Sequence, residues 1–252
     1  MARPEPRTLT LLSRTQVTPH MVRLRLGGSG LAGFPQGSEG GYVKLRLSEG
    51  GDGAKPVVRT YTIRHQGEDG LDIDFVVHGL DHDTPGPAVS WALNAAIGDT
   101  IVVGGPGPAK PLPASMDRYL VAGDMTALPA ISVNIESLPA DARGAAVIEI
   151  QHEDDRQDIA VPQGFAIHWL VNPHSGNDPE LLLRAMRDLG WQDGETYAWV
   201  AAEFSTMRAL RDYFRIERGL GPDRLYVSSY WKQGEDEDNH RVTKRADLDA
   251  VG

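Results

Sequence analysis

The chain has 252 residues, a formal net charge of −10 at pH 7 and no cysteine. Its 40% hydrophobic and 24% charged residues are typical of a folded globular protein with room for two modest domains, which excludes extensive disorder. The lack of cysteine excludes disulfides, thiolate nucleophiles and iron–sulfur ligation, and the acidic charge argues against a nucleic-acid partner. The N-terminal sequence MARPEPRTLT lacks the apolar core of a secretory signal, and no later run is long enough to span a membrane. We therefore expect a cytoplasmic protein without a membrane partner.

The first part of the chain is predicted to contain mainly β-strands. Hydrophobic and polar residues alternate in six runs, at 8–13, 21–27, 42–47, 57–64, 71–77 and 100–103. Gly, Pro and Asp separate these runs, as in an antiparallel sheet. Six such strands can close into a small barrel, which leaves no unpaired edge. We therefore expect a six-stranded antiparallel barrel domain over residues 1–108.

The strand at 57–64 contains the sequence RTYT at 59–62, which suggests a flavin site. Side chains of a strand alternate between two faces, so Arg59 and Tyr61 share one face and Thr62 lies on the other. A cation on the first face can meet a diphosphate, and a phenol ring there can lie against an isoalloxazine. A hydroxyl or N–H at Thr62 can reach the flavin N5 or O4, so Tyr61 and Thr62 are the candidate catalytic residues. An ordinary barrel strand with an exposed Arg and a half-buried Tyr is the alternative.

A second candidate flavin-binding segment follows the strand LDIDFVVHG at 71–79. A turn at Gly86 and Pro87 opens a short helix to Ala96, whose unsatisfied N–H groups attract phosphate, and Ser90 adds a hydroxyl. A cation and an aromatic ring on a strand, followed by this helix start, are in the order that a dinucleotide flavin requires, so FAD is favoured over FMN. The candidate cofactor-binding residues of the barrel are Arg59, Thr60, Tyr61, Thr62, Asp74, Val76, His78, Gly79, Ala88, Val89, Ser90 and Trp91.

The second part of the chain is predicted to alternate strands and helices. The clearest linker sequence is GGPGPAKPLP at 104–113, and we place the linker between the domains at 109–116. Residues 117–231 then have the pattern of a smaller, doubly wound, nucleotide-binding-like parallel-sheet domain. Its predicted strands are 119–122, 145–151, 166–171, 196–202 and 224–228, and its predicted helices are 127–138, 181–189 and 207–218. The charged tail 232–252 is expected to be an irregular arm or a short final helix.

Polar residues follow two strands of this predicted sheet, at the carboxyl ends where open sheets bind ligands. Asp124, Thr126 and Ala127 are candidate cofactor-binding residues, and helix capping explains the first two equally well. The run His152–Arg156 contains three acids, which would accept hydrogen bonds from a ribose 2′-OH and repel a 2′-phosphate. This favours NADH over NADPH as electron donor, unless the run is only a solvated acidic loop.

Three other polar groups are candidate sites. Glu203 follows the strand 196–202 and can contact a nicotinamide or position a substrate, although helix capping by Ser205 explains the local polarity as well. Two clusters, at 78–83 and 235–240, combine carboxylates and histidines but lack the spacing of a metal motif, so we expect no metal site. No nucleophile elbow is present, which leaves hydrolysis without support.

Taken in order, several segments resemble the siderophore-interacting proteins, FAD-dependent ferric-siderophore reductases of the ferredoxin-reductase-like superfamily. The segments are RTYT at 59–62, DFVVHG at 74–79, GPAVSWA at 86–92, GDTIVVGGPGP at 98–108, AGDMTALPAI at 122–131, WVAAE at 199–203 and SYWKQGEDED at 229–238. The resemblance covers nearly the whole chain. The family often has Glu at the position of Met125 and Gly at that of Ala202, so a role for an acid at the first position is absent here, and the second substitution affects how closely a nicotinamide can approach.

The resemblance also implies roles for the residues after the last strand. It implies that Tyr230 and Trp231 lie near the flavin, with a packing anchor for the tail as the alternative, and that Lys232 helps to bind the substrate. Further candidate substrate residues in the tail are Arg241, Lys244 and Arg245.

The residues and the resemblance together predict a ferric-siderophore reductase. In this interpretation FAD passes electrons from NADH, NADPH or reduced ferredoxin one at a time to chelated Fe(III), which releases Fe(II) for iron assimilation. The alternatives are a flavin reductase with a protein electron acceptor and a non-catalytic binder of ferric chelates. The net charge of −10 would repel anionic tricatecholates at long range, so a hydroxamate siderophore is preferred.

Overall fold

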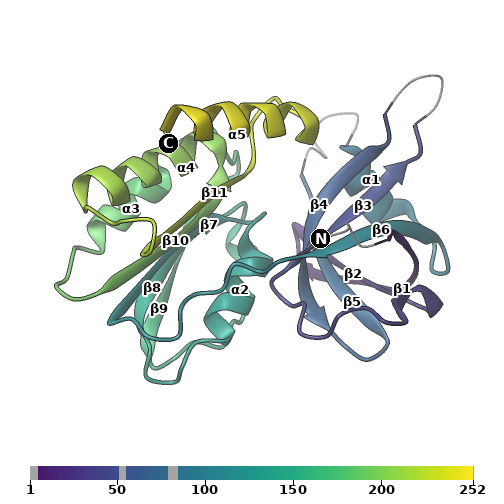
Figure 1. The fold of residues 1–252 in the computed structure, drawn as a ribbon, viewed down its shortest axis with the longest axis horizontal. Helices are drawn as coiled ribbons and strands as arrows, with labels where there is room; N and C mark the ends of the chain where they lie inside the picture. The colour runs from purple at the N-terminus through teal and green to yellow at the C-terminus, as the bar shows by residue number, and fades with distance from the viewer. Residues whose placement is uncertain (1–4, 51–54, 79–84, 252) are drawn as a thin grey trace. The chain divides into compact units, whose positions relative to one another are not determined.

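The chain folds into two compact units, Met1–Pro111 and Leu112–Gly252. A computed structural model describes residues 5–50, 55–78 and 85–251 (Figure 1). The first unit contains a closed barrel and the second an open five-stranded sheet, and each has a hydrophobic core of its own. This confirms the predicted fold class. Within the described residues, no helix combines the length and the apolar character needed to cross a membrane.

The barrel of the first unit is antiparallel throughout, with the strand order β1-β2-β5-β4-β3-β6. The strands are β1 (Arg7–Thr18), β2 (Met21–Gly27), β3 (Tyr42–Ser48), β4 (Val57–Gln66), β5 (Gly70–Val76) and β6 (Thr100–Gly107). A 3₁₀ turn, η1 (Ser29–Leu31), and one helix, α1 (Pro87–Asn94), complete the described part of this unit. Alternate residues such as Leu24, Leu45 and Ile73 are fully buried inside, as the period of two predicts.

Strand β6 is longer than its apolar run predicts, since it includes Gly104–Gly107 from the expected linker. Gly104 and Gly107 pair with Lys44 and Tyr42 of β3. The Tyr42 ring lies so close over Gly107 that an added Cβ would come within 2.0 Å of it, so a side chain at this position would force the exposed ring to move. These residues therefore belong to the strand rather than to a linker.

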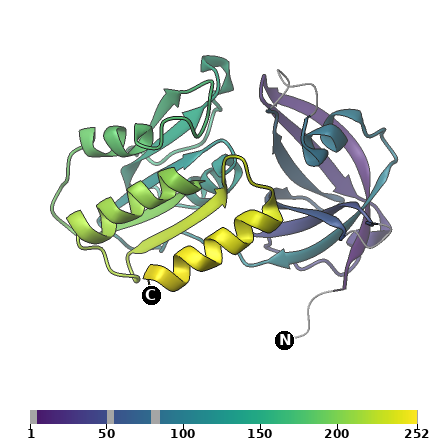
Figure 2. The ribbon, with the colours of Figure 1, turned by 90° about the horizontal axis from the view of Figure 1, so that it is seen from above.

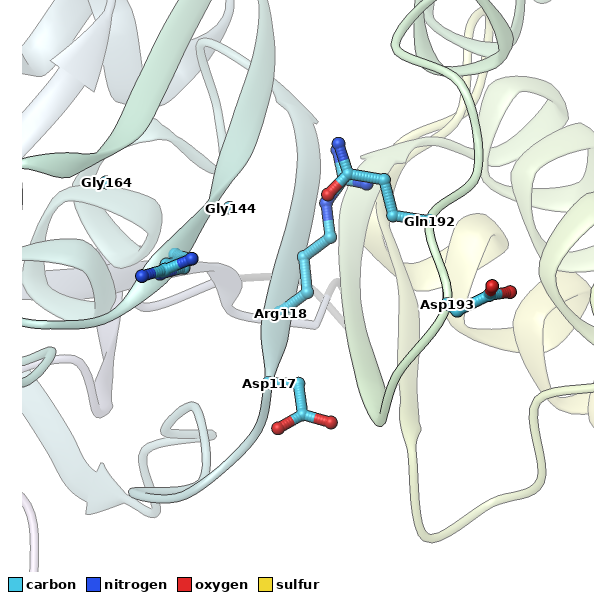
Figure 3. Close-up of a pocket in the computed structure, with 7 residues that line it drawn as sticks. Asp117, Arg118, Gly144, Gly164, Gln192 and Asp193 are labelled. Carbon is cyan, nitrogen blue, oxygen red and sulfur yellow. The ribbon is translucent and has the colours of Figure 1, made fainter.

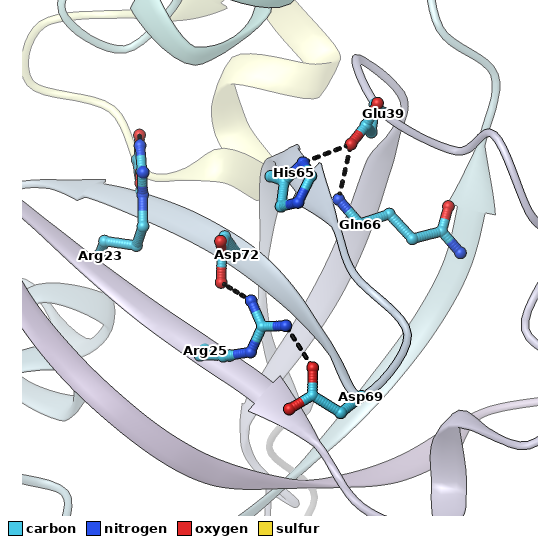
Figure 4. Close-up of polar contacts among 8 residues, drawn as sticks. Arg23, Arg25, Glu39, His65, Gln66, Asp69 and Asp72 are labelled. Carbon is cyan, nitrogen blue, oxygen red and sulfur yellow. Dashed lines mark hydrogen bonds and ion pairs between the residues drawn. The ribbon is translucent and has the colours of Figure 1, made fainter.

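Ion pairs join neighbouring strands of the barrel (Figure 4). Arg25 of β2 binds Asp72 of β5 at 2.8 Å and also binds Asp69 in the preceding turn. His65 of β4 lies 2.6 Å from the carboxylate of Glu39, which also accepts a hydrogen bond from the backbone of Gln66. These contacts fix the register of strands whose other face is the core.

The second unit contains a parallel sheet with the strand order β11-β10-β7-β8-β9. Its strands are β7 (Arg118–Asp124), β8 (Arg143–Ile150), β9 (Gly164–Val171), β10 (Thr196–Glu203) and β11 (Leu225–Trp231). The chain runs outward from β7 to β9 and then returns to the other side of β7, so the topological switch point lies between β7 and β10. Open α/β sheets bind ligands at the carboxyl ends of such a strand pair.

Helices cover both faces of this sheet (Figures 1 and 2). The helical segments are α2 (Leu128–Glu136), η2 (Glu153–Asp155), α3 (Leu181–Asp188), α4 (Phe204–Asp212), the π-helical turn η3 (Tyr213–Glu217) and α5 (Glu237–Val251). Leu182, Met186 and Leu210 of α3 and α4 share one core with Leu120 and Val200 of the sheet. The predicted helix 207–218 thus begins earlier, at Phe204, and changes to a π-helical turn in its last part.

The tail differs most from expectation, because α5 is a regular helix of 15 residues rather than an arm or a short helix. Polar contacts hold it against the unit. His240 lies 2.8 Å from the hydroxyl of Ser229 on β11, and Asp247 pairs with Arg211 of α4. The tail has few apolar residues, so its periodicity alone does not reveal a packed face.

Candidate functional site

The RTYT segment of β4 has the predicted alternation of faces. Arg59 and Tyr61 pair with Leu45 and Val43 of β3, which belong to the barrel core, so all four side chains share one face of the sheet. The Tyr61 ring packs on Phe75 of β5, with ring centroids 4.2 Å apart and a tilt of 34°. This contact fixes the ring of the predicted flavin-stacking residue.

The opposite face of β4 carries the two threonines. Thr60 is exposed and its hydroxyl accepts a hydrogen bond of 3.0 Å from Lys44. Thr62 is half-buried and pairs with Tyr42 of β3. The structure therefore presents two hydroxyls on the face away from Arg59.

Arg59 is a half-buried cation without a counter-ion among the described residues. Its guanidinium donates one hydrogen bond, of 2.9 Å, to the carbonyl of the neighbouring Val58. A guanidinium that lacks a carboxylate partner in such a position is suited to an anion from a ligand, and its planar donors match phosphate oxygens. The donor chemistry of this strand thus fits the diphosphate of FAD.

Helix α1 supplies a second candidate phosphate-binding element. Gly86 precedes the helix and no side chain caps it, so the first backbone N–H groups have no partner of that kind among the described residues. Ala88 and Val89 are buried in the barrel core, whereas Ser90 and Trp91 are half-buried. Arg14 of β1 holds the other end of the helix, because its guanidinium donates to the carbonyls of Ala92 (2.7 Å) and Ala95.

The predicted residues of β5 have different surroundings. The carboxylate of Asp74 is buried and forms a bidentate ion pair with Arg23 of β2, in which Nε lies 2.6 Å from Oδ1 and Nη2 lies 2.8 Å from Oδ2. This side chain is therefore occupied by a contact within the barrel. Val76 is half-buried and His78 exposed, while Gly79 lies outside the described residues, as does most of the cluster 78–83.

Asp124 is the centre of the polar network at the carboxyl edge of the parallel sheet. Only 3% of the residue is exposed. Its Oδ1 accepts hydrogen bonds from the backbone (2.9 Å) and hydroxyl of Thr126, and its Oδ2 accepts from the backbone of Glu203 and from the indole of Trp231, both at 2.8 Å. Burial raises the pKa of Asp124, and these hydrogen bonds oppose that rise. The carboxylate thereby joins the ends of β7, β10 and β11. Ala127, the other candidate of this loop, is fully buried at the start of α2.

Two further buried carboxylates lie on the adjacent strand ends. Glu203 caps α4 by accepting from the backbone of Ser205 (2.5 Å) and Thr206 (3.3 Å), and also accepts from the backbone of Gln233 (3.2 Å). The expected capping by Ser205 was wrong, because the helix begins at Phe204 and places Glu203 at the N-cap.

Glu149 of β8 was missed by the sequence analysis. It lies in register with Asp124 and accepts a hydrogen bond of 2.6 Å from Ser175. Burial raises its pKa, and the nearby charge of Asp124 adds to the rise. The signal in the sequence was a single charged residue within the apolar run AAVIEI.

The segment after β11 contains the predicted substrate lysine. Tyr230 meets Trp199 edge-on at 6.5 Å, and Trp231 is anchored to Asp124, so both aromatic residues have packing roles in this unit. Lys232 forms an ion pair of 2.5 Å with Glu235, and its ammonium lies 5.3 Å from the centre of the Phe204 ring.

The three candidate substrate residues of α5 are in unlike positions. Lys244 is turned toward β11, where it donates to the hydroxyl of Ser228 (2.6 Å) and the carbonyl of Ser229 (2.9 Å), and burial lowers its pKa. Arg241 is exposed and lies 3.4 Å from Asp238, and Arg245 is exposed. Lys244 thus stabilises the position of α5 and is not presented to a ligand.

The acidic run after β8 forms a closed turn, η2. Asp155 is fully buried and accepts a hydrogen bond of 2.9 Å from the backbone of His152, whose ring accepts one of 3.2 Å from the backbone of Asp154. Arg156 pairs with Glu153. Asp154 is exposed like Glu153, but it forms no ion pair with Arg156.

A cavity of about 470 Å³ lies at the opposite, amino edge of the parallel sheet (Figure 3). It is lined by Asp117, Arg118, Arg143, Gly144, Gly164, Gln192 and Asp193. None of the predicted site residues that the structure describes lines it. The cavity is therefore separate from the carboxyl edge, where the geometry gathers Asp124, Glu203 and Trp231.

Comparisons with known proteins match both units. A model described as siderophore-interacting protein matches residues 116–234, and a model described as siderophore-interacting FAD-binding domain matches residues 49–110. The ferric vibriobactin reductase ViuB of Vibrio cholerae is 33% identical, covering 97% of this chain and 96% of that protein. The mycobactin import ATP-binding/permease protein IrtA of Mycobacterium tuberculosis is 26% identical over 95% of this chain but only 27% of its own length.

Solved structures extend the comparison. The siderophore-interacting protein SipS from Aeromonas hydrophila has a TM-score of 0.84 at 32% identity, covering 97% of this chain and 98% of that one. A siderophore utilization protein from T. fusca has a TM-score of 0.82 at 31% identity, covering 92% and 94%. Ferredoxin-NADP⁺ reductase from Plasmodium falciparum, at 13% identity with 90% and 97% covered, shares the fold with a TM-score of 0.66.

Proposed function

Because the chain belongs to the siderophore-interacting protein family, we propose that it is an FAD-dependent oxidoreductase that reduces ferric iron held by a siderophore. The observation that carries this proposal is the 33% identity, over nearly the full length of both chains, to a ferric vibriobactin reductase. We further propose that residues 1–108 are the FAD-binding domain, that 117–231 are the NAD(P)H-binding-like domain, and that the protein is cytoplasmic.

In this proposal the barrel holds FAD. Arg59, which lacks an acidic partner among the described residues, neutralises the diphosphate together with the N–H groups at the start of α1. The ring of Tyr61, fixed by Phe75, offers an apolar surface to the isoalloxazine, and Thr62 offers a hydroxyl. Bound FAD would supply the chemistry that accepts a hydride and releases electrons singly.

The protein's own groups supply the positive charge that the cofactor meets. The fixed cation at Arg59 costs little reorganisation when the cofactor binds, because its guanidinium has only one backbone acceptor to release within the described residues. Each ferric ion that takes one electron becomes ferrous. Ferrous iron binds hard oxygen ligands less tightly, so the reduced chelate releases it.

The electron donor is proposed to be NADH, with NADPH and reduced ferredoxin as the other donors to be compared. The exposed carboxylate of Asp154 near the end of β8 favours a free ribose hydroxyl over a phosphate. Arg156 works against this preference, although its pairing with Glu153 offsets its charge.

The substrate is proposed to be a ferric siderophore, with Lys232 as its main contact and the exposed Arg241 and Arg245 as further cations. A hydroxamate is preferred, because the net charge of −10 disfavours an anionic tricatecholate at long range.

An anaerobic absorbance titration tests the proposal. The purified protein is loaded with FAD, reduced, and mixed with a ferric hydroxamate while a ferrous trap is present. We expect rapid return of the oxidised flavin band with stoichiometric ferrous iron. A protein that cannot be loaded with FAD would instead support a non-catalytic chelate binder, and a loaded protein indifferent to the chelate would support a flavin reductase with a protein acceptor. Reduction rates with NADH, NADPH and ferredoxin then rank the donors.

A further inference from the structure

Lys232, the proposed substrate cation, does not present an unpaired charge. Its Nζ lies 2.5 Å from the Oε1 of Glu235, three residues later, and the backbone of Glu235 closes the turn by donating to the carbonyl of Lys232 at 3.1 Å. Both side chains are only partly accessible, with 30% and 23% exposed. A ligand that approaches this lysine therefore also meets a carboxylate.

Helix α5 holds this carboxylate in place. The hydroxyl of Thr243 lies 3.1 and 2.9 Å from the two carboxylate oxygens of Glu235. The contact with Lys232, followed by the hydroxyl of Thr243, keeps the pKa of Glu235 below its ordinary value, so the group stays ionised at neutral pH. The ammonium of Lys232 also lies 5.3 Å from the Phe204 ring, so its own position is restricted.

We infer that Glu235 is a specificity-determining residue, which neutralises Lys232 and so makes the site select neutral or cationic ferric chelates over strongly anionic ones. This inference rests on the proposed function and assigns it a substrate class. A neutral or cationic hydroxamate chelate can be accommodated without breaking the ion pair. A trianionic tricatecholate must either displace Glu235 from Lys232 or bind beside a pair that offers it no net positive charge.

The size of the effect follows from charge alone. Removing one negative charge on the order of 10 Å from a trianion should improve its binding by roughly eightfold in water, and should weaken binding of a monocation by about twofold. Salt screens such interactions, so the measurement belongs at about 10 mM ionic strength, where the Debye length is about 30 Å.

The test compares Glu235→Gln with Asp188→Asn. Both variants raise the net charge by one unit, but Asp188 is exposed on α3 and has no contact with Lys232, Arg241 or Arg245 among those of the described residues. For each protein, kcat/KM is measured with a ferric tricatecholate and with a cationic ferric trihydroxamate. Each variant is compared with the wild type on the same chelate, so the reduction potential of that chelate cancels.

We expect Glu235→Gln to raise kcat/KM for the tricatecholate by roughly fivefold to tenfold, mainly through KM, with less than a twofold change in Asp188→Asn. At about 1 M salt the gain should nearly vanish. Equal gains in both variants would show an effect of net charge only and would overturn the inference, as would an unchanged ratio or a gain that persists at high salt.

A second variant tests the same contact if Glu235→Gln does not fold. Thr243→Val keeps the charge of Glu235 but removes its anchor on α5, so an anionic chelate should displace the carboxylate more easily and its kcat/KM should at least double. No change would overturn the inference. A wild-type protein that reduces neither chelate would contradict the proposed function itself, whereas reduction of both with unchanged ratios in the variants contradicts this inference alone.

Discussion

Replacing Asp124 should destabilise the second unit more than replacing any one of its partners. In Asp124→Ala, four donors lose their acceptor: the backbone and hydroxyl of Thr126, the backbone of Glu203 and the indole of Trp231. The Thr126 hydroxyl can rotate toward another acceptor. The other three donors are fixed in position, and no side-chain acceptor there replaces the carboxylate. A buried donor without a partner costs about 1–3 kcal/mol. The variant also no longer buries a carboxylate, and this offsets part of the cost. We therefore expect a net loss of about 3–5 kcal/mol in the free energy of unfolding.

Asp124→Asn separates the hydrogen bonds from the charge. If the amide oxygen takes the place of Oδ2, the bonds from Glu203 and Trp231 remain and the NH₂ group faces Thr126. The hydroxyl of Thr126 can then accept a hydrogen bond from that NH₂ group, and only its backbone N–H is left without an acceptor. We expect a loss of about 1–2 kcal/mol. Trp231→Phe removes the indole donor and leaves a smaller aromatic ring, so it should cost about 1 kcal/mol.

Urea unfolding followed by tryptophan fluorescence measures these losses. Four of the five tryptophans, at 169, 191, 199 and 231, belong to the second unit, so the signal reports mainly on it. Trp231→Phe removes one of these fluorophores, and its transition is therefore also followed by circular dichroism. Equal losses in Asp124→Ala and Asp124→Asn, or a loss below about 1 kcal/mol in Asp124→Ala, would refute the view that this carboxylate joins the three strand ends.

Three further predictions concern the cofactor, the substrate and pH. Arg59→Ala should lower FAD occupancy at equal folding, measured by absorbance after gel filtration, whereas Arg46→Ala on the neighbouring strand should not; full retention of FAD would remove Arg59 from the site. Lys232→Ala leaves Glu235 without its cation, so it should raise the KM for the ferric tricatecholate several-fold with flavin content unchanged; an unaltered KM would argue against the contact of Lys232 with the chelate. Burial lowers the pKa of His240, with Lys244 adding to the effect, so the folded state binds fewer protons and stability should fall as pH drops below about 6.5. His240→Gln should flatten this dependence in pH-resolved unfolding curves, while a change at the exposed His168 should leave it intact; no flattening would contradict the assignment.

The sequence analysis succeeded where structure follows from local patterns. Hydrophobic and polar residues that alternate with a period of two predicted the strands of the barrel. The alternation of strands with helices predicted the parallel sheet. The faces of β4 followed in the same way, since Arg59 and Tyr61 do share a face with the core residues of β3. The family resemblance of short ordered segments, such as RTYT, is confirmed by relatives that match nearly the whole chain.

It failed where polar contacts between distant residues decide the structure. The hydrogen bond from Trp231 to Asp124 joins residues 107 positions apart, and the bond from Glu203 joins residues 79 apart. Helix α5 was not expected as a long helix, because Ser229–His240 and Arg211–Asp247 contacts rather than an apolar stripe hold it. Neither kind of contact has a period, so no pattern along the chain reveals it.

The same limitation applies to the candidate substrate residues. From the sequence, only the family resemblance separates Lys232 from Lys244 and Arg241, the weaker candidates in the same charged tail. In the structure the ammonium of Lys244 donates a hydrogen bond to Ser228 of β11, and Arg241 lies beside Asp238. Lys232 is paired with the carboxylate of Glu235, which also contacts Thr243. The charge that a chelate meets is thus set by which acid each cation faces, and not by the number of cations. For that reason the net charge of −10 is a weaker guide to the substrate than the single pair formed by Lys232 and Glu235.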